Sequence, residues 1–122
     1  MTSREIGSIC EKYAAQYMAG EGMEILRLNF YCREGEIDIV AREDEYTVFA
    51  EVKARKGTSF GEPREAVTAE KQRRIIMAAQ KYLMEQSAET AVRFDVVEII
   101  YRMHNEKPEV LKINHIRDAF TL

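Results

Sequence analysis

Two acidic residues and a lysine have the types and spacing that could do chemistry on a phosphate. Asp38 is followed by twelve residues and then by Glu51-Val52-Lys53. Two carboxylates held close together repel, so a cation must lie between them or one must take up a proton. Mg²⁺ suits such a pair because it accepts a few carboxylate oxygens and keeps several waters. A bound ion of this kind activates water and neutralises charge on a phosphate, and a nearby lysine can steady the same charge.

The elements that would position these residues are two neighbouring strands. Residues 35–41 and 46–53 are rich in β-forming side chains, and the polar stretch between them indicates a hairpin. If the turn centres on positions 44 and 45, paired positions sum to 89. This register sets Asp38 opposite Glu51, with Cβ atoms roughly 5 Å apart.

Strand alternation places four charged side chains on one face of this hairpin and an apolar set on the other. The register pairs Glu36 with Lys53 beside the Asp38 and Glu51 pair. The opposite face is expected to be core and carries Ile37, Ile39, Ala50 and Val52. The alternative reading is that the charged face is simply solvated, and that Glu36 and Lys53 form a surface ion pair of little energetic value.

Glu11 is a further candidate because of its place on the first expected helix. It lies at the edge of the apolar stripe, beside Gly7 and Ala14, rather than on the polar side. A carboxylate there could reach the sheet and contribute to the site, directly or through a water. The alternative is an ordinary solvated glutamate.

The rest of the chain alternates between helical and β patterns. Helices over residues 3–19 and 69–85, the second begun by Thr68 as N-cap, are expected to cover a sheet. The expected strands are 25–30, 35–41, 46–53 and 92–101, with 110–113 pairing beside the last as a hairpin and 116–120 closing the chain. The order αβββαβ, with this extra C-terminal strand, predicts an α/β fold in one domain over residues 1–122.

Composition is that of an ordinary globular protein, with 46% hydrophobic and 32% charged residues. No apolar run is long enough to span a membrane, and the first residues lack the apolar stretch of a signal peptide, so we expect a cytoplasmic location. Cys10 and Cys32 lack metal-binding spacing and are expected to be small buried hydrophobes. The net charge is −3, yet residues 53–81 carry eight basic and three acidic side chains, which is typical of a basic face or of a solvated helix surface.

The strings around these residues carry a resemblance to known proteins. Asp38 with Glu51-Val52-Lys53 resembles the PD-(D/E)XK nuclease signature, with Ile37 in place of its proline. More specific strings resemble the bacterial YraN-like family, which is similar to archaeal Holliday-junction resolvases. These strings are Gly35-Glu-Ile-Asp-Ile-Val, Val48-Phe-Ala-Glu-Val-Lys-Ala-Arg55, Phe60-Gly-x-Pro63, Lys71-Gln-x-Arg74 and Arg93-Phe-Asp-Val-Val97.

This resemblance implies a restriction-endonuclease-like core, in which helices flank a central mixed sheet, and metal-dependent hydrolysis of DNA phosphodiester bonds at branched or damaged DNA. It implies that Asp38 and Glu51 are ligands of Mg²⁺ or Mn²⁺, that the carbonyl of Val52 is an additional ligand, and that Lys53 is the catalytic lysine. Glu11 matches the first-helix glutamate of resolvase-like members. Related resolvases act as dimers, so a homodimer is the assembly that the resemblance suggests.

A second set of residues could meet a nucleic acid. Lys71 and Arg74 lie near the start of the second expected helix, and Lys71 extends its apolar stripe. Together with Arg55 and the helix N-terminus they could hold a phosphate. The alternative is that these basic side chains only serve solubility.

Other polar and aromatic residues are expected to be structural. Asp95 lies in an otherwise apolar strand and is expected to satisfy a nearby backbone or basic group. His104 and His115 lack ligand spacing and receive no role. Three tyrosines lie on helical apolar stripes and are expected in the core: Tyr13, Tyr17 and Tyr82.

Three functions follow from these patterns. The leading hypothesis is an Mg²⁺- or Mn²⁺-dependent endonuclease acting on DNA. The second is a non-catalytic nucleic-acid-binding module of a DNA repair or recombination complex. In the third, the acidic hairpin only docks a basic partner protein.

Overall fold

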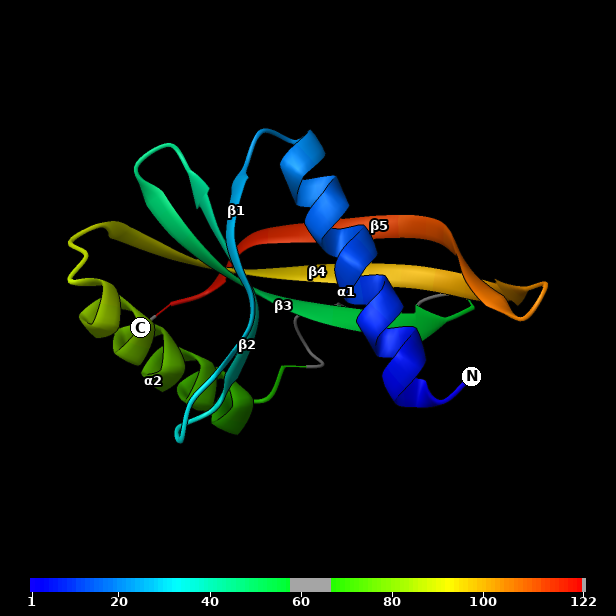
Figure 1. The fold of residues 1–122 in the computed structure, drawn as a ribbon, viewed down its shortest axis with the longest axis horizontal. Helices are drawn as coiled ribbons and strands as arrows, with labels where there is room; N and C mark the ends of the chain where they lie inside the picture. The colour runs from blue at the N-terminus through cyan, green and yellow to red at the C-terminus, as the bar shows by residue number, and fades with distance from the viewer. Residues whose placement is uncertain (58–66, 122) are drawn as a thin grey trace.

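The computed structural model describes residues 1–57 and 67–121, so the string Phe60-Gly-x-Pro63 lies outside the described residues. Five strands form one sheet in the order β1-β2-β3-β4-β5 (Figure 1). Neighbouring strands are antiparallel except β3 and β4, which are parallel. The elements are α1 (Ser3–Gly20), β1 (Glu24–Tyr31), β2 (Glu36–Glu43), β3 (Tyr46–Lys56), α2 (Ala69–Gln86), β4 (Ala91–His104) and β5 (Lys107–Phe120). This confirms the α/β order, and the sheet is mixed.

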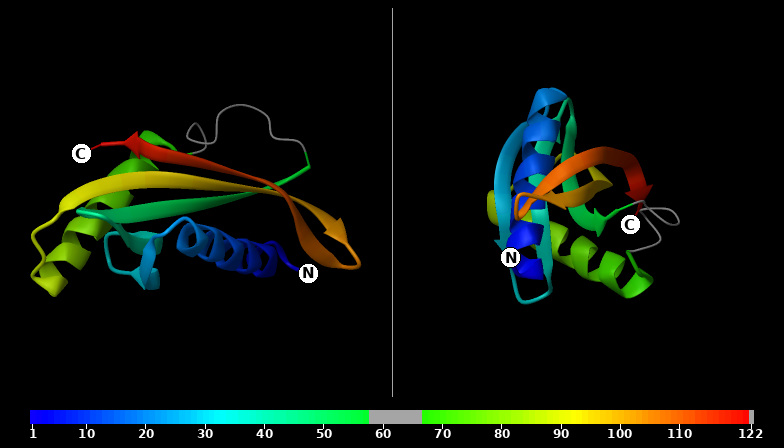
Figure 2. Two further views of the ribbon diagram at one scale, coloured as in Figure 1. Left: turned by 90° about the horizontal axis from the view of Figure 1, so that it is seen from above. Right: turned by 90° about the vertical axis from the view of Figure 1, so that its right-hand side faces the viewer.

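The C-terminal strand is longer than expected. Residues 116–120, expected as a separate closing segment, belong to β5, which pairs with β4 from His104↔Lys107 to Phe94↔Phe120. Two register shifts in this ladder let the strand follow the twist of β4 along its length. The turn between β4 and β5 projects beyond the rest of the molecule (Figure 2).

Helix α1 begins with a capping box. The Thr2 hydroxyl accepts a hydrogen bond from the Glu5 N–H at 3.1 Å, and the Glu5 carboxylate accepts one from the Thr2 N–H at 2.9 Å. The expected apolar stripe is confirmed for Cys10, Ala14 and Met18, which are buried. Tyr13 was expected in the core, but it is exposed because it lies on the outer side of the helix.

Helix α2 begins at the expected cap, where the Thr68 hydroxyl accepts a hydrogen bond from the Lys71 N–H at 3.1 Å. Its Tyr82 is buried, as expected, and packs edge-on against Phe49 of β3. The next residue of β3, Ala50, packs instead in the cluster that holds Met18 of α1. The two helices therefore cover opposite faces of the sheet, since successive strand residues point to opposite faces.

The apolar face expected for the hairpin is confirmed for three of its four residues. Ile39 and Ala50 are buried in the α1-side cluster, and Val52 packs against it. Ile37 lies instead in the α2-side cluster, beside Phe30 of β1. Ile37 and Phe30 are register partners and lie in the same cluster, and Asn29, which precedes Phe30, has a positive φ of 52°.

Both cysteines are free. Cys10 is buried as expected, whereas Cys32 is only half-buried and its thiol donates to the Gly35 carbonyl at 3.5 Å. Among the described residues, no helix combines the length and the apolar character needed to cross a membrane.

Candidate active site

The candidate site lies where β2 and β3 separate. The five backbone pairs of their ladder have the expected register and end at Ile39. The next expected pairs, Asp38 with Glu51 and Glu36 with Lys53, are not ladder pairs. Beyond this point β3 stays with β4, while the β1–β2 hairpin turns away toward α2 (Figure 1). The stretch beyond Ile39 in which β2 and β3 have no ladder pairs is called the opening below.

Asp38 bridges this opening with its side chain. Its Oδ2 accepts a hydrogen bond from the Val52 N–H at 2.8 Å. The carboxylate thereby replaces the strand carbonyl that would otherwise satisfy this backbone donor. Asp38 and Glu51 are only 6% and 7% exposed. The reading of this face as simply solvated is therefore wrong for these two carboxyl groups.

The carboxyl groups of Asp38 and Glu51 interact directly and are both buried, so a negative charge on both at once is unfavourable. Burial raises the pKa of Asp38 to about 8, and hydrogen bonding to Glu51 and repulsion from its charge act in the same direction. The hydrogen bond from the Val52 N–H acts against this rise. At neutral pH Asp38 therefore keeps its proton, and protonation of one partner is one of the two states that close carboxylates allow. A cation would be the other.

Two further glutamates, Glu11 and Glu36, lie near the Asp38–Glu51 pair. Burial raises the pKa of Glu11 to about 7, and the charges of Asp38 and Glu36 add to the rise. Burial, the charge of Asp38 and a hydrogen bond with Asp38 raise the pKa of Glu36. Glu11 from α1 and Glu36 from β2 line one hollow of about 320 Å³. The expected approach of Glu11 to the sheet is thus seen in the structure.

Helix α2 brings a cation to the acidic pair. The Nζ of Lys71 lies 3.5 Å from Oε2 of Glu51. The helix can come this close because the β1–β2 turn has a glycine where it meets α2: a Cβ on Gly35 would lie 3.0 Å from the Arg74 carbonyl oxygen. Such a contact is tighter than nearly all Cβ contacts in proteins, so a side chain at position 35 would push the turn and α2 apart.

The other expected phosphate contacts are dispersed. Arg74 forms a surface ion pair with Glu70 at 3.2 Å and lines, with Thr68 and Lys71, a hollow of about 180 Å³ at the start of α2. Arg55 is not among the lining residues of that hollow. Its Nε lies 2.6 Å from Oε2 of Glu98, which is fully buried. Its role in phosphate binding stays a prediction.

Lys53 follows Glu51 by two residues in a strand that pairs regularly with β4. It therefore projects from the same face as Glu51, with its Cα about 7 Å further along. The side chain is half-buried, and its register neighbour on β4 is Glu98. Glu98 also accepts a hydrogen bond from Asn114 of β5 at 2.8 Å. Glu98 was not predicted as a functional residue, although an acidic residue inside the apolar run 96–100 is a signal for a buried ion pair.

Asp95 has the structural role expected of it. It is fully buried and binds Arg93 at 2.8 Å, His115 at 2.7 Å and the Asp118 N–H at 3.0 Å. Burial raises its pKa, but these hydrogen bonds outweigh burial and hold the pKa of Asp95 below its usual value. His115, given no role from the sequence, also pairs with the half-buried Tyr17 hydroxyl at 3.1 Å. This network lies on the α1 face, opposite Glu51.

Tyr31 is the other residue that sequence analysis missed. It ends β1, pairs in register with Glu36 and is 62% exposed. The ring lines both the hollow beside Glu11 and a second hollow of about 350 Å³ beside Lys71. The available signal was its distance of five residues from Glu36 across a tight turn.

The donors in this site are those of a hard cation. Among the residues that the structure describes, no group of three or more His, Cys, Asp or Glu side chains is arranged to hold an ion. A divalent ion would therefore use the Asp38 and Glu51 carboxylates and complete its shell with waters and backbone oxygen. This donor set fits Mg²⁺ or Mn²⁺, which accept few protein ligands and keep water.

The fold and site define an α/β protein with a mixed sheet and a buried carboxyl pair where two strands part. The chain belongs to the family described as "Uncharacterised protein family UPF0102", whose model matches residues 10–99. This confirms the family part of the YraN-like resemblance.

Relatives of similar length span nearly the whole chain. A UPF0102 protein of Caldicellulosiruptor saccharolyticus is 44% identical over 98% of this chain and 100% of its own. Another, from Rhodococcus opacus, is 46% identical over 94% of this chain and 95% of its own. A third, from Clostridium perfringens, is 44% identical over 97% of this chain and 95% of its own.

Proposed function

We propose that this protein is a metal-dependent endonuclease of the PD-(D/E)XK superfamily that hydrolyses DNA phosphodiester bonds. The observation that carries the proposal is the buried Asp38–Glu51 pair at the opening between β2 and β3. A pair that must hold a proton or a cation, followed on the same face by Lys53, is the arrangement that phosphodiester chemistry needs. The DNA substrate also makes the cytoplasm its proposed location.

In this proposal Asp38 and Glu51 would hold Mg²⁺ or Mn²⁺, with Asp38 in its deprotonated form. The carbonyl of Val52 would be a further ligand, since the N–H and C=O of a strand residue point to the same side and this N–H donates to Asp38. A bound ion supplies Lewis acidity to the phosphate and an acidified water. Asp38 is already oriented by its hydrogen bond to Val52, so little reorganisation is needed.

The basic residues then act on the phosphate. Lys53 donates hydrogen bonds to the phosphate oxygens and thereby stabilises the negative charge that develops on them. Lys71, whose Nζ lies 3.5 Å from Glu51, would contact the neighbouring phosphate of the strand. Glu11, with a pKa of about 7, is able to accept or release a proton near neutral pH.

A cleavage assay tests this function. Purified protein is incubated with supercoiled plasmid, linear duplex and branched DNA in Mg²⁺, Mn²⁺ or EDTA. We expect cleavage with the metals, and a loss of at least a hundredfold in Asp38→Ala and Lys53→Ala. Lys56→Ala is the matched control, because Lys56 is an exposed lysine on the same strand with the opposite facing. Metal-independent cutting, or full activity in folded Lys53→Ala, would sink the proposal.

A non-catalytic nucleic-acid-binding module is the second candidate. The observation that favours it is the ion pair of Lys71 with Glu51, which already compensates part of the acidic charge without a metal. It predicts salt-sensitive DNA binding that is unchanged by Mg²⁺ or Mn²⁺ and is not followed by cleavage on any of the three DNAs.

A further inference from the structure

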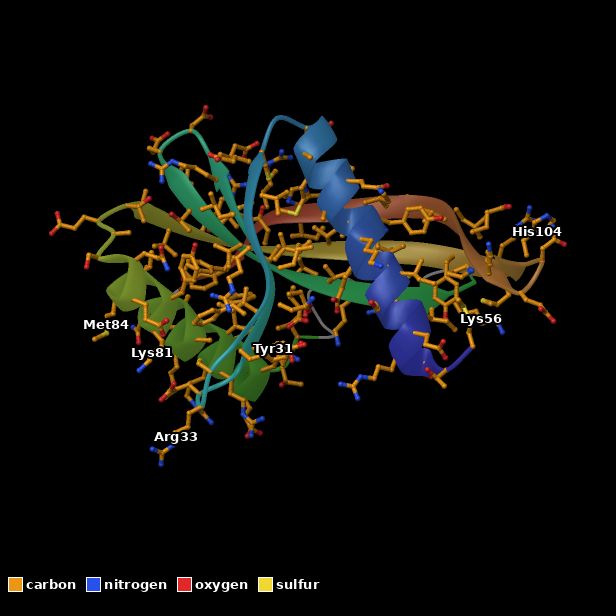
Figure 3. The ribbon with its side chains drawn as sticks, in the orientation of Figure 1. Tyr31, Arg33, Lys56, Lys81, Met84 and His104 are labelled. Atoms are coloured by element: carbon orange, nitrogen blue, oxygen red, sulfur yellow. The ribbon has the colours of Figure 1, made fainter. Side chains whose placement is uncertain are left out.

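Tyr31 is an exposed aromatic residue placed beside the candidate site. It lies at the lower part of the β1–β2 hairpin (Figure 3). Its register partner Glu36 is two residues from Asp38 on the same strand. From the strand rise and the strand spacing, the Cα of Tyr31 is about 8 Å from that of Asp38. This distance is about two or three nucleotides at the ~3.4 Å spacing of stacked bases.

Tyr31 lines two hollows, and each of them is also lined by at least one basic side chain. The hollow of about 320 Å³ on the α1 side is lined by Arg4 and Glu11. The hollow of about 350 Å³ on the α2 side is lined by Lys71 and Arg74. Each has a volume at the lower end of the range that binds small organic groups. Glu36 lines both hollows as well, so the arrangement is an exposed aromatic side chain with basic residues and a carboxylate on each side.

We propose that Tyr31 stacks on an unpaired base of the DNA strand whose phosphate enters the site, while Arg4 and Arg74 contact the flanking phosphates. The substrate class is therefore DNA with single-stranded nucleotides at the cleavage position, such as a flap, a gap or a branch. A base inside a duplex is stacked on both faces and offers no surface to the ring, whereas an unpaired base does. This inference rests on the proposed function and narrows it.

A fluorescence titration tests the stacking directly. The chain has no tryptophan, so Tyr31→Trp creates a single reporter. Titrated in Ca²⁺ buffer with oligothymidylate, this variant is expected to lose about half or more of its emission, because a stacked base quenches the indole. An abasic strand of equal length is expected to bind with little quenching. Tyr13→Trp, on the exposed side of α1, is the matched control and is expected to be quenched by neither strand.

A cleavage comparison gives the second arm. The ratio of kcat/KM for a flapped DNA to that for a continuous duplex is expected to fall about tenfold in Tyr31→Ala. The same ratio is expected to be unchanged in Tyr31→Phe and in Tyr13→Ala. If wild type cuts both DNAs equally and Tyr31→Ala leaves the ratio unchanged, the inference is wrong and the nuclease proposal survives. If wild type cuts neither DNA, the nuclease proposal fails. The fluorescence titration still tests whether a base stacks on Tyr31, because equal quenching of Tyr31→Trp by the abasic strand would overturn the stacking proposal.

Discussion

The Asp38 carboxylate accepts a hydrogen bond from the Val52 N–H at 2.8 Å, where β2 has left β3 and no strand carbonyl is available. This contact fixes the position of one carboxyl group and holds it beside Glu51. The site is thus formed by the end of a strand ladder, and the same backbone group that orients Asp38 belongs to the residue between Glu51 and Lys53.

The charge on Asp38 should make the metal-free protein less stable at high pH. Its pKa is about 8 when folded and near 3.8 when unfolded, so this contribution to stability is fully present below pH 4 and is lost as the pH rises through 8. Asp38→Asn imitates the protonated form, accepting from Val52 and donating to Glu51. We expect it to raise the free energy of unfolding by about 3–4 kcal/mol more at pH 8.5 than at pH 5.

Urea denaturation in EDTA at the two pH values measures this effect. Glu109→Gln, which neutralises an exposed glutamate of β5, is the matched control. If Asp38→Asn and Glu109→Gln change the free energy of unfolding equally at pH 8.5, the charge on Asp38 does not destabilise the folded protein.

Metal uptake should depend on pH for the same reason. An ion that binds the pair must displace its proton, so the dissociation constant for Mn²⁺ should rise up to tenfold for each pH unit below 8. At a hundredfold excess over that constant, the ion stabilises the native state by about 2.7 kcal/mol, seen as a higher Tm. Calorimetric titrations at pH 6, 7 and 8 measure the constant. Affinity independent of pH, or unchanged in Asp38→Asn, would contradict the assignment.

Lys71 should affect DNA and metal in opposite directions. Lys71→Ala removes a cation that contacts a phosphate in the complex, so DNA binding should weaken and the slope of log K against log salt should fall by about 1. It also removes the cation beside Glu51, so Mn²⁺ should bind more tightly. Fluorescence anisotropy across a salt series measures the salt dependence of DNA binding, with Lys81→Ala on the same helix as the control. Identical slopes in both variants would argue against a phosphate contact.

Asp95 should matter for stability rather than for DNA cleavage. Asp95→Ala leaves Arg93 and His115 without their buried partner, which should cost about 3–5 kcal/mol in the free energy of unfolding. Because the pKa of Asp95 is lowered on folding, this stabilisation is present above about pH 4 and lost as the pH falls below that value. Chemical denaturation at pH 7 and 3 tests both points. A cost below 1 kcal/mol, similar to that of exposed Glu109→Ala, would show that the network contributes little.

The sequence by itself determined the elements and the identity of the acidic pair. Helical and β periodicities found both helices and the order of strands, and Thr68 located the start of α2 to the residue. The hairpin register followed from its turn, since alternation allows no slip of one residue without exchanging the two faces. Asp38, Glu51 and Lys53 could be predicted as one set because all three lie on a single hairpin, whose register follows from local sequence.

Only the tertiary structure decided where the hairpin ladder ends and what surrounds it. The β1–β2 turn packs closely on α2 at Gly35 and Arg74, which are 39 positions apart in the chain. The contacts of Lys71 with Glu51, and of Arg55 with Glu98, likewise come from packing between elements. Periodicity describes one element at a time and carries no information on how two elements cross. The acidic pair was therefore readable from the sequence, whereas its burial, its cationic neighbour and the exposed Tyr31 at its edge were set by the packing of α1, α2 and the β1–β2 hairpin.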